Sequence, residues 1–145
     1  MMLSHERVKE LLFQRDPFLW VDEVTQCEPG KYAVSEKYMD PDLPMFKGYC
    51  PSGAEIPAVI LVEAMSQTAG IATALFFESM QTKAGIRLFA GIENARFFKK
   101  AFPGSTLTFK SVLRDPRARF IYADCETYCD GELIAQATVS FAFKK

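Results

Sequence analysis

The longest apolar segment of the chain runs over residues 58–80 and is hydrophobic on nearly every face of a helix. Pro57 precedes it, at a position that suits a first helical turn, and no further proline interrupts it. An apolar helix of this length either spans a membrane or is buried within its own domain. Because Glu63, Gln67 and Thr68 occupy its middle, where a carboxylate in lipid is costly, the pattern predicts a buried core helix.

Alternating apolar and polar residues predict strands on either side of this helix. The clearest alternation covers 132–143, and Asp130-Gly131 before it is a hairpin signal. Glu28-Pro29-Gly30-Lys31 is a second turn, between two strand-like runs. The remaining predicted elements are a short helix over about 4–13 and strands over 19–27, 32–38, 86–98, 106–113 and 120–128.

Residues 39–56 contain too many prolines and glycines for regular structure. Loops of this length in compact domains are usually functional or disordered. The apolar residues within this loop favour the functional alternative, since they would allow it to pack.

These elements predict an α+β fold in which a curved antiparallel sheet wraps around one long apolar helix, at about 57–80. A sheet on one side only would leave half of so apolar a helix in water. The whole chain, 1–145, is long enough for one domain with a proper hydrophobic core. A second subunit would cover the apolar surface that remains.

Composition narrows the classes of function. The net charge of −1 lacks the excess of Lys and Arg on which nucleic-acid binding depends. Four cysteines without a CxxC pair, and a single histidine, His5, near a frayed N-terminus, argue against a metal site. The polar start of the chain does not resemble a signal peptide, so we expect a cytoplasmic protein with free thiols.

Glu63 is the candidate for chemistry within the helix. A carboxyl group in apolar surroundings tends to have a raised pKa, which suits general acid–base catalysis. The nearby helix N-terminus offers unpaired N–H groups that would hold a carbonyl oxygen. The alternative is that Glu63 forms a buried polar patch with Gln67 and has no catalytic role.

Two segments carry a family resemblance, namely 48–51 (Gly-Tyr-Cys-Pro) and, after Pro57, 61–67 (Leu-Val-Glu-Ala-Met-Ser-Gln). Together they resemble the central motif of the β-hydroxyacyl-(acyl carrier protein) dehydratases. The resemblance implies a hotdog fold, which agrees with the fold expected above. Further matches lie at 15–19, 21–22, 89–97, 102–107 and 130–135, so the resemblance covers about 12–143.

The catalytic histidine of that family is missing here. Tyr49 occupies its place, fourteen residues before Glu63, as the family spacing requires. In the family, the histidine is implied to remove the α-proton of a 3-hydroxyacyl thioester, and the glutamate helps the β-hydroxyl to leave as water. A phenol is a poor base at neutral pH and a fair hydrogen-bond donor. Tyr49 would therefore polarise a carbonyl, donate to a leaving group, or simply pack the loop over the helix.

Other motif positions also differ. Ser52 and Ala58 stand where glycines are usual, and Gln14 stands where relatives often carry another histidine. Cys50 replaces a bulky apolar residue and is interpreted as a structural thiol rather than a nucleophile. Besides Glu63 and Tyr49, the resemblance implies a substrate site and an acyl tunnel lined by Gly48, Pro57, Ala58, Gln67, Ile60, Met65, Phe89 and Phe97.

Three functions follow from the resemblance. The first is a dehydratase with Glu63 as its main acid–base group and low activity. The second is a thioesterase that uses Glu63 and needs no histidine. The third is a non-catalytic subunit that completes a heterodimer with a histidine-bearing homologue.

All three functions use an acyl thioester carried on the phosphopantetheine of acyl carrier protein or on coenzyme A, with no other cofactor and no metal. A homodimer or higher oligomer is expected. The candidate contacts for an acidic carrier, which would otherwise form an ordinary solvated face, are Lys99, Lys100, Arg114, Arg117 and Arg119.

Overall fold

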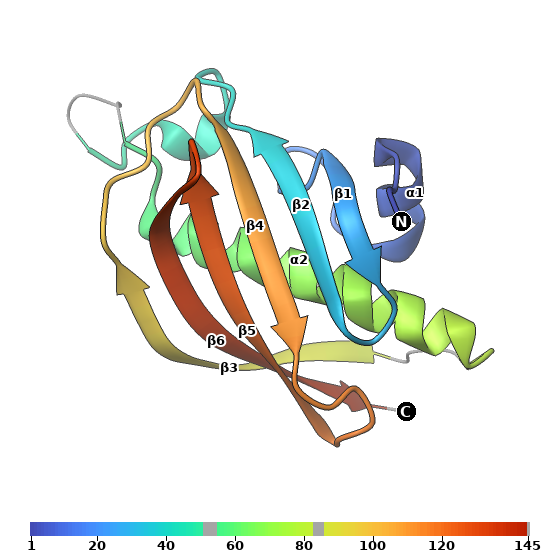
Figure 1. The fold of residues 1–145 in the computed structure, drawn as a ribbon. Coiled ribbons are helices and arrows are strands. Elements are labelled where there is room, and N and C mark those ends of the chain that lie inside the picture. Colours follow the sequence, from blue (N-terminus) through green and yellow to red (C-terminus); the bar gives the residue numbers. More distant parts are fainter. Residues whose placement is uncertain (51–54, 83–85, 145) are drawn as a thin grey trace.

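The long apolar helix is the axis of the fold, and a curved antiparallel sheet surrounds it (Figure 1). The computed structural model describes residues 1–50, 55–82 and 86–144. Within these residues the sheet has six strands in the order β1-β2-β4-β5-β6-β3. The predicted α+β class and the arrangement of sheet and helix are confirmed, and the fold is the hotdog fold.

The described residues form the following elements: α1 (His5–Leu11), β1 (Glu23–Glu28), β2 (Tyr32–Tyr38), η1 (Pro44–Phe46), α2 (Ala58–Ser79), β3 (Ile86–Phe97), β4 (Thr106–Leu113), β5 (Phe120–Cys129) and β6 (Glu132–Lys144). All neighbouring strands pair antiparallel. Most predicted boundaries are correct to within about two residues. The motif positions Pro51 and Ser52 lie outside the described residues.

The predicted strand at 19–27 is wrong in its first part, because β1 begins only at Glu23. The backbone before it pairs with a side chain of α2 instead of a strand. Gln67 accepts a hydrogen bond from the Trp20 N–H and donates one to the Phe18 carbonyl. The buried apolar residues of this stretch suggested a strand, but they pack there as irregular backbone.

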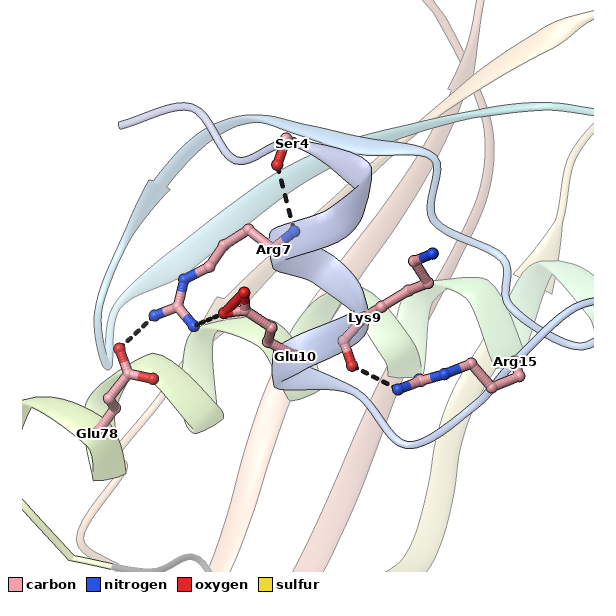
Figure 2. A network of polar contacts seen from close by, with 6 residues as sticks. All are labelled: Ser4, Arg7, Lys9, Glu10, Arg15 and Glu78. Atoms are coloured by element: carbon pink, nitrogen blue, oxygen red, sulfur yellow. Dashed lines mark hydrogen bonds and ion pairs between the residues drawn. The ribbon is translucent and has the colours of Figure 1, made fainter.

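The N-terminal helix is shorter and better anchored than the sequence predicted. Ser4 caps α1 by accepting a hydrogen bond from the Arg7 N–H (3.2 Å), and Arg15 donates to the Lys9 carbonyl near the other end (2.9 Å; Figure 2). The expected frayed end at His5 is wrong, since a ring nitrogen of His5 lies 2.8 Å from the Asp22 carbonyl.

A charged contact joins α1 to the C-terminal end of α2. Arg7 forms ion pairs with Glu10 of its own helix and with Glu78 of α2 (Figure 2). All three side chains remain partly exposed, so the contact orients α1 more than it stabilises the fold.

The interior of the sheet encloses most of α2. The helix packs chiefly against β2, β4 and β5, and it meets two buried serines of the sheet. Ser111 of β4 donates to the Met65 carbonyl (2.8 Å), and Ser35 of β2 bonds to Thr68 (2.7 Å). Although α2 is long and apolar enough to cross a membrane, 78% of its most apolar window is buried inside the fold. The predicted core helix is therefore confirmed.

Strand β3 forms one edge of the sheet and leaves apolar side chains uncovered. Within the described residues it pairs only with β6, and it passes along α2 on the side away from β1 and β2 (Figure 1). Three of its large side chains, Leu88, Phe89 and Ile92, are 51%, 41% and 53% exposed. An edge strand with exposed apolar residues is a site where another chain would pair.

Candidate active site

Glu63 lies in the second turn of α2 and is only partly accessible to solvent. Its carboxylate oxygen Oε2 accepts a hydrogen bond from Nε2 of Gln67, one turn further along the helix, at 3.0 Å. The i, i+4 spacing places the two side chains on the same face of the helix.

Gln67 is fully buried and makes three hydrogen bonds through its amide. Oε1 accepts from the Trp20 N–H at 2.7 Å, and Nε2 donates to the Phe18 carbonyl at 2.9 Å as well as to Glu63. A backbone N–H can only donate and a carbonyl can only accept, so these two partners fix which end of the amide faces Glu63. Glu63 therefore meets a fixed N–H donor.

The surroundings of Glu63 raise the pKa of its carboxyl group above the ordinary value, mainly because burial disfavours the charged form. The hydrogen bond from Gln67 and the positive charge of Arg87 act in the opposite direction but are weaker. The carboxyl group therefore remains protonated to higher pH than a free glutamate, which suits a proton donor.

Arg87, near the start of β3, was not identified from the sequence. Its guanidinium lies against Gly70 of α2 and above the ring of Phe141, 4.7 Å from the ring centroid. The available signal was a cation within the apolar first half of the strand, but strand periodicity alone does not show which face is buried.

The loop residues of the motif lie in a different environment. Gly48 has a positive φ of 79°, a conformation that favours glycine, and an added Cβ would meet no atom within 4 Å. The next residue, Tyr49, is 49% exposed. In the described part of the chain no hydrogen bond joins Tyr49 to Glu63, whose carboxylate is bonded to Gln67 instead.

The start of α2 borders a small pocket. Pro57 occupies the N-cap position, and no side chain of the described residues caps this end of the helix. Ala58 and Phe97 both line this pocket, which has a volume of about 160 Å³. The structure therefore brings together two of the predicted substrate-site residues, next to the uncapped N–H groups.

The four predicted tunnel residues occupy two different environments. Ile60 and Met65 are buried in the core of the chain, at 6% and 0% exposure. Phe89 and Phe97 lie on β3 and are 41% and 44% exposed. A single chain thus leaves one side of the expected acyl site uncovered.

Most of the basic residues expected to meet a carrier protein have carboxylate partners in the same chain. Arg114 makes two hydrogen bonds to Asp124, and Lys99 and Lys100 pair with Glu132 and Glu55. Two arginines pack over aromatic rings instead: the guanidinium carbons of Arg117 and Arg119 lie 5.6 and 5.8 Å from the ring centroids of Phe76 and Phe120.

Solved structures with the same architecture include dehydratases and thioesterases. The dehydratase heterocomplex ApeI:P from Xenorhabdus doucetiae superposes with a TM-score of 0.81 at 15% identity, covering 95% of this chain and 91% of that chain. A hypothetical thioesterase with coenzyme A from Streptococcus pneumoniae gives a TM-score of 0.64 at 11% identity, covering 83% and 84%. At these identities the likeness defines the class of fold, a hotdog protein.

Sequence similarity identifies the family. The model of the FabA-like domain matches residues 12–138. The 3-hydroxyacyl-(acyl-carrier-protein) dehydratase FabZ of Ruminiclostridium cellulolyticum is 37% identical over 99% of both chains, and that of Clostridioides difficile is 36% identical over 97% of both. The chain therefore belongs to the FabA-like family and is a dehydratase-like hotdog protein.

Proposed function

We propose that this protein binds acyl thioesters and that Glu63 is the group that gives or takes a proton at the acyl chain. The observation that carries the proposal is the arrangement of Glu63 and Gln67. A buried amide, itself held by two backbone hydrogen bonds, orients a carboxyl group whose pKa is raised by burial. A structural polar patch would not require the carboxyl group to remain partly accessible.

The proposed chemistry is the acid half of a dehydration. Protonated Glu63 would donate its proton to the β-hydroxyl of a 3-hydroxyacyl thioester as the C–O bond breaks and water leaves. The α-proton must then pass to a base, and the phenol of Tyr49 is a poor one. The single chain type therefore supplies the acid but not an efficient base, and we expect low turnover from a homodimer.

The proposed assembly is a dimer, supported by the exposed apolar residues of β3 and by the incomplete cover of the expected acyl site. A second candidate function is a subunit that completes a heterodimer with a histidine-bearing homologue. Tyr49 at the histidine position favours it, and the similar ApeI:P dehydratase is itself a heterocomplex.

The proposed substrates are acyl groups on the phosphopantetheine of acyl carrier protein, as the names of the FabZ relatives state for those enzymes, or on coenzyme A. Arg117 and Arg119 are the proposed contacts for an acidic carrier. The proposed location is the cytoplasm, where the free thiols of Cys27, Cys125 and Cys129 would remain reduced.

The test combines binding and turnover on purified protein. Wild type and Glu63→Gln are incubated with 3-hydroxyacyl thioesters on both carriers, and products are followed by mass spectrometry. We expect both proteins to bind and wild type to form the enoyl product slowly, with Glu63→Gln at least about a hundredfold slower still. Release of free thiol from acyl thioesters without a 3-hydroxyl would replace the dehydratase proposal with a hydrolase. Failure of wild type to bind any acyl thioester would overturn the proposal.

A further inference from the structure

Arg87 is a partly buried cation beside α2 that the proposed acid–base chemistry does not use. An ideal Cβ built on Gly70 would lie only 2.0 Å from Nη1 of Arg87. The guanidinium therefore occupies the space that the side chain of any residue other than glycine at position 70 would fill. Gly70 is therefore the reason that the arginine side chain fits beneath the helix.

The surroundings of the guanidinium are mostly apolar. It lies 4.7 Å from the ring centroid of Phe141 and 5.8 Å from that of Phe13, and Leu12 approaches the same point of α2. Burial lowers the pKa of Arg87, and the charge of Glu63 partly restores it. An arginine nevertheless stays protonated in proteins, so the site contains a positive charge.

The side chain of Arg87 lacks strong acceptors. A guanidinium carries five N–H donors, and the side chain of Arg87 is only partly buried, so these donors are within reach of an entering group. Among the described residues, the guanidinium lies against two aromatic rings and against Gly70 of α2, and the charge of Glu63 acts on it without an ion pair within 4 Å. A carboxylate or carbonyl oxygen entering this space would meet unused donors in surroundings that strengthen a charged hydrogen bond.

Arg87 also lies on the line that an acyl chain would follow. Glu63, Gln67 and Gly70 have the spacing i, i+4, i+7 and share one face of α2. Gly70 is roughly 10 Å further along the helix axis than Glu63, at about 1.5 Å per residue. An acyl chain with its reacting end at Glu63 that runs beside the buried Gln67 side chain toward Gly70 would reach the guanidinium with its other end.

We propose that Arg87 closes the distal end of the acyl site and selects acyl groups whose far end carries a hydrogen-bond acceptor, such as a carboxylate or carbonyl, over plain alkyl chains. The inference rests on the proposed function, because it takes the acyl group to bind along the Glu63 face. A terminal methyl group would desolvate the guanidinium without offering it an acceptor, whereas a carboxylate would form a charge-assisted and bidentate pair.

The test compares two ligands of equal length on the purified full chain. The probes are non-hydrolysable amide analogues of octanoyl-pantetheine and of suberoyl-pantetheine, which differ in a terminal methyl or carboxylate, and Kd is measured by calorimetry. Wild type is expected to bind the carboxylate analogue at least about tenfold more tightly. Arg87→Met should reverse the preference, and Gly70→Ala, which displaces the guanidinium but keeps its charge, should reduce it. Arg96→Met, on the same strand but exposed, is the matched control and should preserve it.

The outcomes separate this inference from the proposed function. Binding of the alkyl analogue by wild type as tightly as the carboxylate analogue, or equal losses for both analogues in Arg87→Met, overturns the role of Arg87 alone. Failure of wild type to bind either analogue overturns the proposed acyl site and this inference with it. Circular dichroism on each variant confirms folding, and Gly70→Ala provides the same comparison if Arg87→Met unfolds.

Discussion

The two parts of the family motif differ sharply in how firmly the fold holds them. On α2, Glu63 is half-buried beside Gln67, whose amide is fixed by the backbone of residues 18–20. In the loop, Gly48 has open space around it and Tyr49 is 49% exposed. The helix part of the site is thus built within one chain, whereas no hydrogen bond among the described residues joins Tyr49 to Glu63.

This difference explains which change in the motif the fold tolerates. Replacing Gln67 would leave buried backbone groups without hydrogen-bond partners, so the stability of the fold depends on the residue at this position. An exposed loop side chain such as Tyr49 has no comparable role in one chain. A change at position 49 should therefore cost little stability, whereas a change at Gln67 should cost much more.

The largest expected effect comes from breaking the helix part with Gln67→Leu. The buried Trp20 N–H and Phe18 carbonyl would both lose their partner, and each such loss costs about 1–3 kcal/mol. We expect the free energy of unfolding to fall by about 3 kcal/mol in urea titrations. A fall below about 1 kcal/mol would show that the amide is not what holds residues 18–20 to α2.

The next prediction concerns the second chain that we expect to complete the site beside the loop. Wild type should sediment as a dimer at micromolar concentration, because the apolar side chains of β3 need cover. Ile92→Glu places a charge at this edge and should raise the dimer Kd at least about tenfold. Lys110→Glu, on an exposed position of the interior strand β4, is the matched control. A monomeric wild type would contradict the proposed assembly.

Much of the fold and part of the site could be predicted from the sequence, for identifiable reasons. The strands β2 and β4 alternate between apolar and polar residues, and α2 is a long apolar run that no proline interrupts, so their predicted positions agree with the structure. The contact of Gln67 with residues 18–20 could not be predicted, because a long-range pairing of a side chain with irregular backbone leaves no periodic signal. Arg87 escaped prediction for a related reason: its burial depends on Gly70, seventeen residues away in the sequence.

A smaller effect concerns the charge on Glu63. Its raised pKa means that the folded chain binds this proton more tightly than the unfolded chain, so stability is lost as pH rises from about 4.5 through the raised value. A glutamine side chain at this position would keep an acceptor for the Gln67 amide but would not ionise. Glu63→Gln should therefore match the stability of wild type at low pH. At pH 7 its free energy of unfolding should exceed that of wild type by at most about 1 kcal/mol, because the carboxyl group is partly exposed. Thermal unfolding across pH would reveal the opposite trend if the carboxylate form stabilised the fold.

The smallest effect is expected from Tyr49→Phe, which removes one exposed hydroxyl from the loop part. The free energy of unfolding should change by less than about 0.5 kcal/mol, as measured by urea titration. A loss comparable to that of Gln67→Leu would mean that Tyr49 is a structural residue of the single chain, and the contrast between the two parts would disappear.

The central claim is that the helix part of the site is competent and that the loop part limits the reaction. The most direct measurement is the dehydration rate of 3-hydroxyacyl carrier-protein substrate by purified Tyr49→His beside wild type, followed by mass spectrometry. Supplying an imidazole base at position 49 should raise the rate by roughly a hundredfold or more. Equal rates for the two proteins, whether both fast or both absent, would contradict the claim, since the residue at position 49 would then not be what limits catalysis.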